Sequence, residues 1–218
     1  MIDVTKSTRD IKALNSLCQV LLNLALVDIK KNGINPLVVE TYRPQERENY
    51  LYCKGRTVAQ CVAKGIKKSF AEKYCTMAEG QKTWTLNSIH TKKNAVDLIP
   101  QRNGKAIWNS IDKETIKIID IMQKYGFEAG ANWSSSPDSP HFQIKGVSTN
   151  GNAYSATNNN VYITKVIQKA LNKKLGIHLV VDGNWGSLTT AAINDFRKAN
   201  GWSKNGKLGT TALKTLLS

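Results

Sequence analysis

A stretch without apolar periodicity divides the sequence and limits how the chain can fold. The segment GVSTNGNAYSATNNN, from Gly146 to Asn160, is rich in Gly, Asn, Ser and Thr, a composition typical of a linker. A chain of 218 residues has room for one medium and one small domain. We therefore predict an N-terminal domain over residues 1–146, a linker over 147–160 and a C-terminal domain over 161–218.

The N-terminal part mixes helical and strand patterns without regular alternation. Apolar residues from Ile11 to Ala25 recur at helical spacing, with Ser7 or Thr8 as a start signal and Gly33 as a stop. Strand-like segments are 37–42, 84–88, 95–100 and 141–145, and further helical segments are 45–52 and 113–126. This pattern predicts an α+β domain with a small antiparallel sheet flanked by helices.

The C-terminal part contains only helical patterns. Apolar stripes or capped starts occur at 163–176, 187–201 and 209–218, and Asp182-Gly183 marks a turn. The sequence therefore predicts a small all-α module of three helices with a modest core.

The net charge is strongly positive. Lys and Arg number 31 against 16 Asp and Glu, which gives +15, and residues 161–218 alone carry nine basic residues against Asp182 and Asp195, or +7. Such a chain is attracted to polyanions, either nucleic acid or the anionic polymers of a bacterial wall. No helix-turn-helix, RNP or zinc-finger pattern accompanies the charge, so we expect no nucleic-acid partner.

The N-terminal apolar segment resembles neither a membrane span nor a signal peptide. Residues 17–29 are interrupted by Gln19, Asn23 and Asp28, and are shorter than the about 20 apolar residues that a span needs. Asp3 and Asp10 lie where a signal peptide would be basic. We therefore expect no transmembrane segment and a protein made in the cytoplasm without a signal peptide.

Four cysteines lie in the first third of the chain. No two of them show C-x-x-C spacing, which is typical of zinc knuckles and redox sites. We expect reduced thiols, some of them buried as small apolar side chains. A disulfide would imply an oxidising compartment. These residues are Cys18, Cys53, Cys61 and Cys75.

Two of the three histidines lie beside carboxylates. His90 precedes Asp97 by seven residues, and Asp138 precedes His141 by three. Two His and one Asp form a suitable ligand set for a catalytic zinc ion and leave a fourth position for water. Asp138 can then act as the base that accepts a proton without binding the metal. His178 has no such neighbour, and we expect it at the surface.

These motifs resemble those of the LAS metallopeptidases, or peptidase family M15. That family includes VanY- and VanX-type D-Ala-D-Ala peptidases and phage L-alanyl-D-glutamate endopeptidases. The run SIHTKKNAVD (88–97) resembles the signature S-x-H-x-x-G-x-A-x-D, and DSPHFQ (138–143), with Trp133 upstream, resembles the second motif. ETYRP (40–44) and GRT (55–57) are similar to the N-terminal motifs, so the resemblance spans nearly all of residues 35–145.

The resemblance implies a role for each matching residue. The zinc ligands would be His90, Asp97 and His141, and Asp138 would be the catalytic base. Arg43 would stabilise the oxyanion. Ser88 and Trp133 would contact the substrate.

Two features depart from the family pattern. Lys93 stands where the family usually has Gly, and a positive φ there would cost Lys about 1 kcal/mol. The segment Val58–Thr83, which contains Cys61 and Cys75, is longer than expected between the motifs. We interpret it as an insertion on the substrate side.

The C-terminal part resembles the peptidoglycan-binding domain 1 family. The matching positions are Gln168, Leu171, Asn172, Asp182 to Gly186, Thr189, Ala192, Phe196, Gly206, Gly209 and Leu213. Trp185 and Trp202 either stack on wall sugars or pack in the core, since aromatic rings serve both purposes.

Together these motifs predict a monomeric zinc-dependent endopeptidase that cuts the L-Ala–D-Glu bond of peptidoglycan, similar to a phage endolysin released through a holin. Its partners would be peptidoglycan and anionic wall polymers. The alternative is a D-Ala-D-Ala carboxypeptidase, which needs a cationic side chain for the terminal carboxylate. A wall-binding protein without activity would require the loss of a ligand or of the base, and the sequence keeps both.

Overall fold

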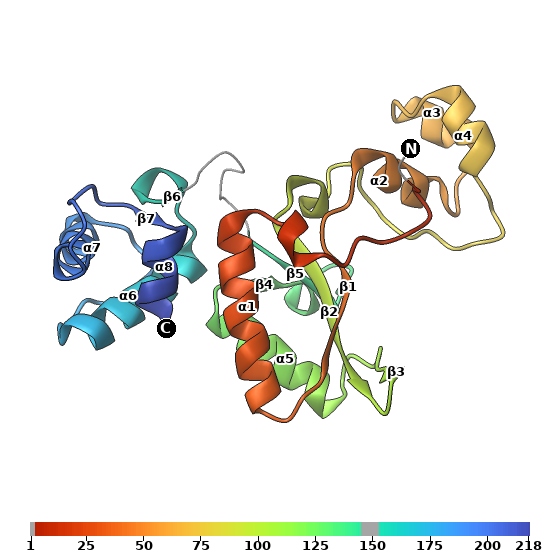
Figure 1. The fold of residues 1–218 in the computed structure, drawn as a ribbon. Coiled ribbons are helices and arrows are strands. Elements are labelled where there is room, and N and C mark those ends of the chain that lie inside the picture. Colours follow the sequence, from red (N-terminus) through yellow and green to blue (C-terminus); the bar gives the residue numbers. More distant parts are fainter. Residues whose placement is uncertain (1–2, 145–152) are drawn as a thin grey trace.

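A computed structural model describes residues 3–144 and 153–218 (Figure 1). The N-terminal part is α+β, as predicted. Its antiparallel sheet has the strand order β1-β2-β5-β4, with β3 paired to β2. These strands are β1 (Pro36–Glu40), β2 (Ala95–Arg102), β3 (Lys105–Ala106), β4 (Glu128–Ala129) and β5 (His141–Gln143).

Two amphipathic helices supply most of the apolar surface that covers this sheet. Helices α1 (Ser16–Lys31) and α5 (Lys113–Lys124) pack on each other, and α5 also packs on β2. Gly126, at φ 89°, follows α5 as the predicted stop. Burial of their apolar faces against Phe127 and Phe142 forms the centre of the core.

The predicted start of the first helix is wrong. Asn15 caps α1 by accepting a hydrogen bond from the Cys18 amide at 2.9 Å, and a separate 3₁₀ turn, η1 (Ile11–Ala13), precedes it. The capping side chain lies eight residues after Ser7, so Ser7 lies outside the helix. Gly33, at φ 75°, follows the end of α1 as predicted.

The predicted strand at residues 84–88 is also wrong. The Thr85 hydroxyl accepts a hydrogen bond from the Asn87 amide at 2.9 Å, and Ser88 caps the 3₁₀ turn η2 (Ile89–Lys92). Short polar side chains that bond to nearby backbone compete with strand pairing. The other three predicted strands and the two helices predicted at 45–52 and 113–126 are confirmed, within a few residues at their ends.

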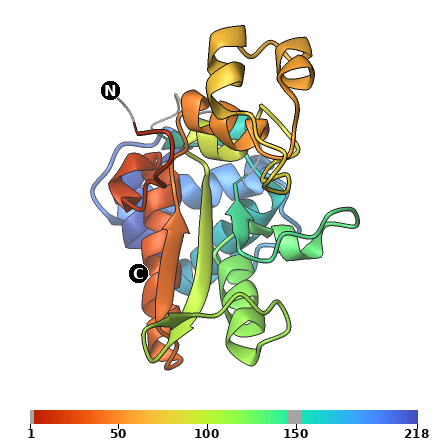
Figure 2. The ribbon, with the colours of Figure 1, turned by 90° about the vertical axis from the view of Figure 1, so that its right-hand side faces the viewer.

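Three short helices form a separate group. They are α2 (Gln45–Cys53), α3 (Val58–Ala63) and α4 (Lys68–Tyr74). Figures 1 and 2 both show α3 and α4 projecting beyond the sheet. Most of the long segment Val58–Thr83 therefore forms this projection and the chain that returns from it.

The C-terminal part contains the three predicted helices. These are α6 (Val161–Leu175), α7 (Ser187–Ala199) and α8 (Thr210–Leu217), and a two-stranded sheet joins β6 (Ala153–Tyr154) to β7 (Leu208–Gly209). Residues 147–152 of the predicted linker lie outside the described residues. The rest of that segment contains β6 and a 3₁₀ turn, η4 (Ala156–Asn158).

The two parts share one hydrophobic core. Helix α8 packs against α1, and Gly126 lies so close to Ile163 that an added Cβ would come within 2.9 Å of its side chain. Within the described ranges, none of the helices has the length and apolar character needed to cross a membrane.

Candidate metal centre and cleft

The strand register brings two of the predicted ligands together. Asp97 on β2 lies directly opposite His141 on β5, and on its other side Asp97 pairs with Glu40 at the end of β1. Opposite residues of antiparallel strands project from the same face of the sheet. Sequence positions 40, 97 and 141 thus form one row across three strands.

His90 joins this row from the turn η2. Its Nε2 lies 3.1 Å from Asp97 Oδ1 and 3.2 Å from His141 Nδ1, and His141 Nδ1 lies 3.2 Å from the same Asp97 oxygen. The three donor atoms form a nearly equilateral triangle. A zinc ion with bonds of about 2.0–2.1 Å places tetrahedral ligands about 3.3 Å apart, so the triangle fits this ion closely.

Hydrogen bonds at the outer ring nitrogens select the tautomers that can bind a metal. His90 Nδ1 donates to the Thr41 carbonyl oxygen at 2.6 Å, which leaves the lone pair on Nε2. His141 Nε2 donates to Gln143 Oε1 at 3.1 Å, which leaves the lone pair on Nδ1. Two lone pairs and a carboxylate oxygen therefore converge on one point, and this donor set suits a divalent cation.

The electrostatics of the three residues also favour positive charge between them. Burial disfavours ionisation of Asp97, but interactions with His90 and His141 outweigh it and hold the pKa of Asp97 below its usual range. Burial likewise disfavours the charged form of His141, but its hydrogen bond to Asp97 outweighs this and raises the pKa of His141.

A chain of hydrogen bonds begins at the ring nitrogen of His141 that faces away from the other two donors. The Gln143 amide donates to Glu128 Oε2 at 3.2 Å, and the Trp133 indole donates to Glu128 Oε1 at 2.8 Å. The Trp133 ring lies 5.2 Å from the His141 ring, centre to centre. Trp133, expected at the substrate, therefore also orients a residue of the metal centre.

Arg43 lies beside the centre and contacts three carboxylates. It donates to Glu40 at 2.6 Å and to Glu48 at 2.9 Å, and its Nη2 lies 3.7 Å from Asp97 Oδ2. Glu48 is fully buried, so part of the charge of Arg43 balances an acid in the interior. The guanidinium still borders the cleft described next.

A cleft of about 850 Å³ opens above the three donors. Its walls include all the predicted residues of the N-terminal part, which are Arg43, Ser88, His90, Asp97, Trp133, Asp138 and His141. Asp138 lies at the solvent-exposed rim, where partial loss of hydration and the charge of Asp97 raise the pKa of its carboxyl. Ser88 is buried, and its hydroxyl accepts a hydrogen bond from the His90 amide.

Three supporting residues were missed by sequence reasoning. Thr41 acts through its backbone carbonyl, which no side-chain pattern reveals. Gln143 lies two residues after His141 on the same strand face, a spacing that suggests the contact only once the strand is known. Glu128 is distant in sequence, and only the pairing of β4 with β5 brings it near.

Lys93 adopts the positive φ that the family pattern suggested. It ends η2 at φ 61°, and its amide donates to the His90 carbonyl oxygen at 3.1 Å. Lysine is therefore accommodated without displacing His90 from the donor triangle.

The two tryptophans of the C-terminal part differ in exposure. Trp185 is 7 % exposed, contacts Tyr154 edge to face and donates to Thr190 Oγ1 at 3.1 Å. Of the two roles left open for Trp185, this placement favours packing in the core over stacking on sugars. Trp202 is half-buried against Phe196, with Arg197 near its ring.

Two family models match separate parts of the chain. Residues 81–144 match the family model Peptidase M15, described as D-alanyl-D-alanine carboxypeptidase. Residues 163–216 match the model described as putative peptidoglycan binding domain. The first match contains both histidines and both aspartates of the site.

Two solved structures resemble the chain at low identity. The Serratia marcescens L-Ala D-Glu endopeptidase ChiX is 19 % identical, with a TM-score of 0.42, over 65 % of this chain and 88 % of that one. The vancomycin resistance D,D-pentapeptidase VanY from a VanB-type cassette, in complex with Zn(II), is 17 % identical, with a TM-score of 0.37, over 58 % of this chain and 70 % of that one. From its family matches, the chain contains a peptidase M15 family domain followed by a peptidoglycan-binding domain.

Proposed function

We propose that this protein is a zinc-dependent endopeptidase that cleaves the peptide stem of peptidoglycan at the L-Ala–D-Glu bond. The observation that supports the proposal most is the triangle of His90, Asp97 and His141 donors at the base of a cleft that Asp138 and Arg43 also border. In the endolysin setting that the resemblance implies, a holin would release the enzyme to the wall.

His90, Asp97 and His141 would hold the zinc ion, which when bound lowers the pKa of water and polarises the scissile carbonyl. Asp138 accepts the proton of the attacking water and passes it to the leaving amine. Its raised pKa makes the protonated form easier to reach between these two transfers. Arg43 donates to the carbonyl oxygen as negative charge develops there.

A polymeric substrate suits the two-domain organisation. The cleft is large enough for several residues of a peptide stem. The matched peptidoglycan-binding domain would keep the peptidase near its polymer and raise its local concentration there.

A D-Ala-D-Ala carboxypeptidase is the second candidate. Lys82 lines the cleft, and its ammonium group is a suitable partner for the terminal carboxylate that such a substrate carries. The description of the matching family model also favours this activity.

Mass spectrometry of digested peptidoglycan distinguishes the two activities. The endopeptidase exposes a new amino terminus on D-Glu, whereas the carboxypeptidase releases free D-Ala. Lys82→Ala should leave the endopeptidase KM nearly unchanged, but it should raise the KM of a carboxypeptidase. Release of D-Ala alone would overturn the endopeptidase proposal.

The metal and the base are tested with Asp138→Asn. We expect this variant to bind zinc as the parent protein does and to lose about 10²-fold or more in turnover. Treatment with a chelator should abolish activity of the parent protein, and added zinc should restore it. Loss of zinc from Asp138→Asn would instead make Asp138 a ligand.

A further inference from the structure

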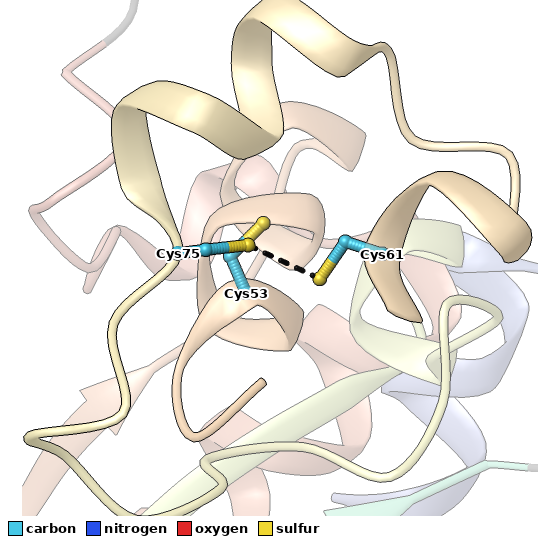
Figure 3. A group of neighbouring side chains, drawn as sticks. All are labelled: Cys53, Cys61 and Cys75. Carbon is cyan, nitrogen blue, oxygen red and sulfur yellow. Dashed lines mark hydrogen bonds between the residues drawn. The ribbon is translucent and has the colours of Figure 1, made fainter. Parts of the chain in front are cut away.

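A second group of side chains with metal-binding chemistry lies in the projecting helices. The Sγ atoms of Cys53, Cys61 and Cys75 all lie within 4.8 Å of one another. Those of Cys61 and Cys75 are 3.4 Å apart. Figure 3 shows the three side chains, which come from three separate helical segments, converging on one another.

The backbone holds the three cysteines in place. Cys53 is the last residue of α2, Cys61 lies within α3, and Cys75 directly follows α4. The Gly55 amide donates to the Thr76 carbonyl at 2.8 Å, which ties the chain after Cys53 to the chain after Cys75. The sulfur atoms therefore converge because of the local fold, and an ion can bind with little rearrangement.

This group of helices has little other stabilisation. Its buried core consists of only five residues: Tyr52, Cys53, Cys61, Ile66 and Ala71. Helices α3 and α4, of six and seven residues, are far too short to be stable by themselves. Small structural units with such limited cores usually contain a disulfide or a metal ion. A disulfide would connect two of the three segments, whereas a metal ion would connect all three.

The charge of Arg56 supplies an independent observation. Its guanidinium is buried, and it donates to the Tyr52 carbonyl, the Gln81 side chain and the Thr83 carbonyl, all neutral oxygens. Within residues 3–144 and 153–218 it has no carboxylate partner. Buried charges are normally paired. A divalent ion bound by three thiolates carries a net charge of −1 and would provide the missing counter-charge close by.

We propose that Cys53, Cys61 and Cys75 bind a second, structural metal ion, a thiophilic divalent cation such as zinc. Zn–S bonds of about 2.3 Å place sulfur atoms about 3.8 Å apart. This value lies between the 3.4 Å that separates the Sγ atoms of Cys61 and Cys75 and the 4.8 Å within which all three Sγ atoms lie. Each thiol releases its proton to solvent on binding. Cys53 and Cys61 are buried and Cys75 is partly exposed, and a water molecule would take the fourth coordination position.

The ion would also stabilise one wall of the catalytic cleft. Arg56 donates to the Thr83 carbonyl at 2.9 Å, and Thr83 lines the cleft together with Lys82 and Trp84. Loss of the ion would loosen this wall while the donor triangle of the first site stays intact. The proposal does not depend on the proposed peptidase activity.

Cobalt spectroscopy tests the site in the full-length protein. Metal-free protein, kept reduced with a phosphine, is titrated with Co²⁺. We expect an intense near-ultraviolet charge-transfer band that only thiolate ligands produce, and about two Co²⁺ per chain when both sites are filled. The variant His90→Ala/His141→Ala should keep the band and bind one Co²⁺ fewer, which separates this site from the first.

Cysteine variants identify the ligands. Cys53→Ala, Cys61→Ala and Cys75→Ala should each lose the band. Cys18→Ala is the matched control, because Cys18 is fully buried like Cys53 and Cys61 but lies in the main core, and this variant should keep the band. If a variant fails to fold, the spectrum of the parent protein still decides.

Two results would overturn the proposal. The first is a reduced parent protein that binds Co²⁺ without the thiolate band, so that the cysteines are only packed thiols. The second is a disulfide between Cys61 and Cys75 that mass spectrometry of peptides detects in freshly isolated protein, even when zinc is present throughout purification.

Discussion

Lys93 carries a conformational cost next to the metal centre. Its φ of 61° is the left-handed conformation, which disfavours residues with a Cβ by about 1 kcal/mol. The side chain offsets part of this cost, because its ammonium group lies 5.0 Å from the centre of the Tyr42 ring. The backbone of this turn also holds His90 in place, so the strained conformation of Lys93 is part of the segment that positions His90.

We expect Lys93→Gly to raise the free energy of unfolding by less than about 1 kcal/mol, because glycine adopts the left-handed conformation without steric cost but loses the contact with Tyr42. Thermal or urea unfolding monitored by circular dichroism measures the change. Lys93→Ala is the control: it removes the contact with Tyr42 but keeps the Cβ, and it should be no more stable than the parent. Equal gains from both variants would show that the side chain, not the backbone, is responsible.

Arg43 stabilises buried carboxylates in addition to the catalytic role proposed for it. Arg43→Ala should lower kcat by about 10²-fold, because a donor to the developing oxyanion is lost. It should also cost about 3–5 kcal/mol of stability, because the buried Glu48 loses its partner. Lysine at this position should restore only part of either loss, since it lacks the planar fork.

Arg102→Ala provides the matched control for Arg43. Its side chain is 49 % exposed and pairs with Asp112 and Glu114 at the surface, so its loss should cost at most about 1 kcal/mol. Steady-state kinetics with a soluble stem peptide and urea unfolding measure both variants. An effect of Arg43→Ala on KM alone would contradict the role in the transition state.

At the scale of elements, the helices and strands that have a clear local sequence pattern could be predicted from the sequence. The apolar stripes of α1 and α5 and the β-branched run of β2 were recognised from periodicity. The family motifs identified the three donors. The cap at Asn15 and the turn at 84–88 were missed, because several Ser, Thr and Asn residues compete for such positions and only tertiary packing decides among them.

Contacts between elements were beyond the reach of pattern reasoning. The register that sets Asp97 opposite His141 depends on the pairing of β2 and β5, and these two residues are 44 positions apart in the sequence. The cysteines were missed as a group for the same reason. Their spacings of eight and fourteen residues match no ligand motif, and only the packing of α2, α3 and α4 brings them together.

Strand β5 carries both His141, a proposed zinc ligand, and the residue that orients its ring. Because His141 and Gln143 project from the same face, Gln143→Ala should free the outer nitrogen of His141 and lower zinc affinity by about 10–100-fold. Competition with a chromogenic chelator measures this affinity. Gln101→Ala, at the far end of β2, should leave the affinity unchanged, and a similar loss in that control would assign the effect to general destabilisation of the sheet.

At the scale of the whole molecule, the small domain packs on the catalytic domain. Contacts between α1 and α8, and the close approach of Gly126 to Ile163, join the two parts in one core. The sequence alone suggested two tethered modules. Truncation at the predicted linker would expose apolar surface on both sides, so wall binding is better tested with the full-length protein.

We expect full-length Asp138→Asn to sediment with purified walls, because the wall binding proposed here lies in residues 163–216, which match a putative peptidoglycan binding domain, and not in the cleft. Residues 161–218 carry a net charge of +7, which should make part of this binding electrostatic. Binding should therefore weaken as the Debye length falls from about 10 Å at 0.1 M salt to about 3 Å at 1 M.

Two pairs of charge reversals, each made in the Asp138→Asn protein, test which part of the protein is attracted to the anionic wall. Lys173→Glu/Lys174→Glu and Lys30→Glu/Lys31→Glu each reverse an exposed pair at the end of a helix, the first in α6 and the second in α1. Both change the net charge equally. If the small domain faces the wall, the first variant should lose more wall binding at low salt than the second, and walls stripped of anionic polymers should remove that difference. Equal losses would show that the total charge, not the charge of the small domain, directs the protein to the wall.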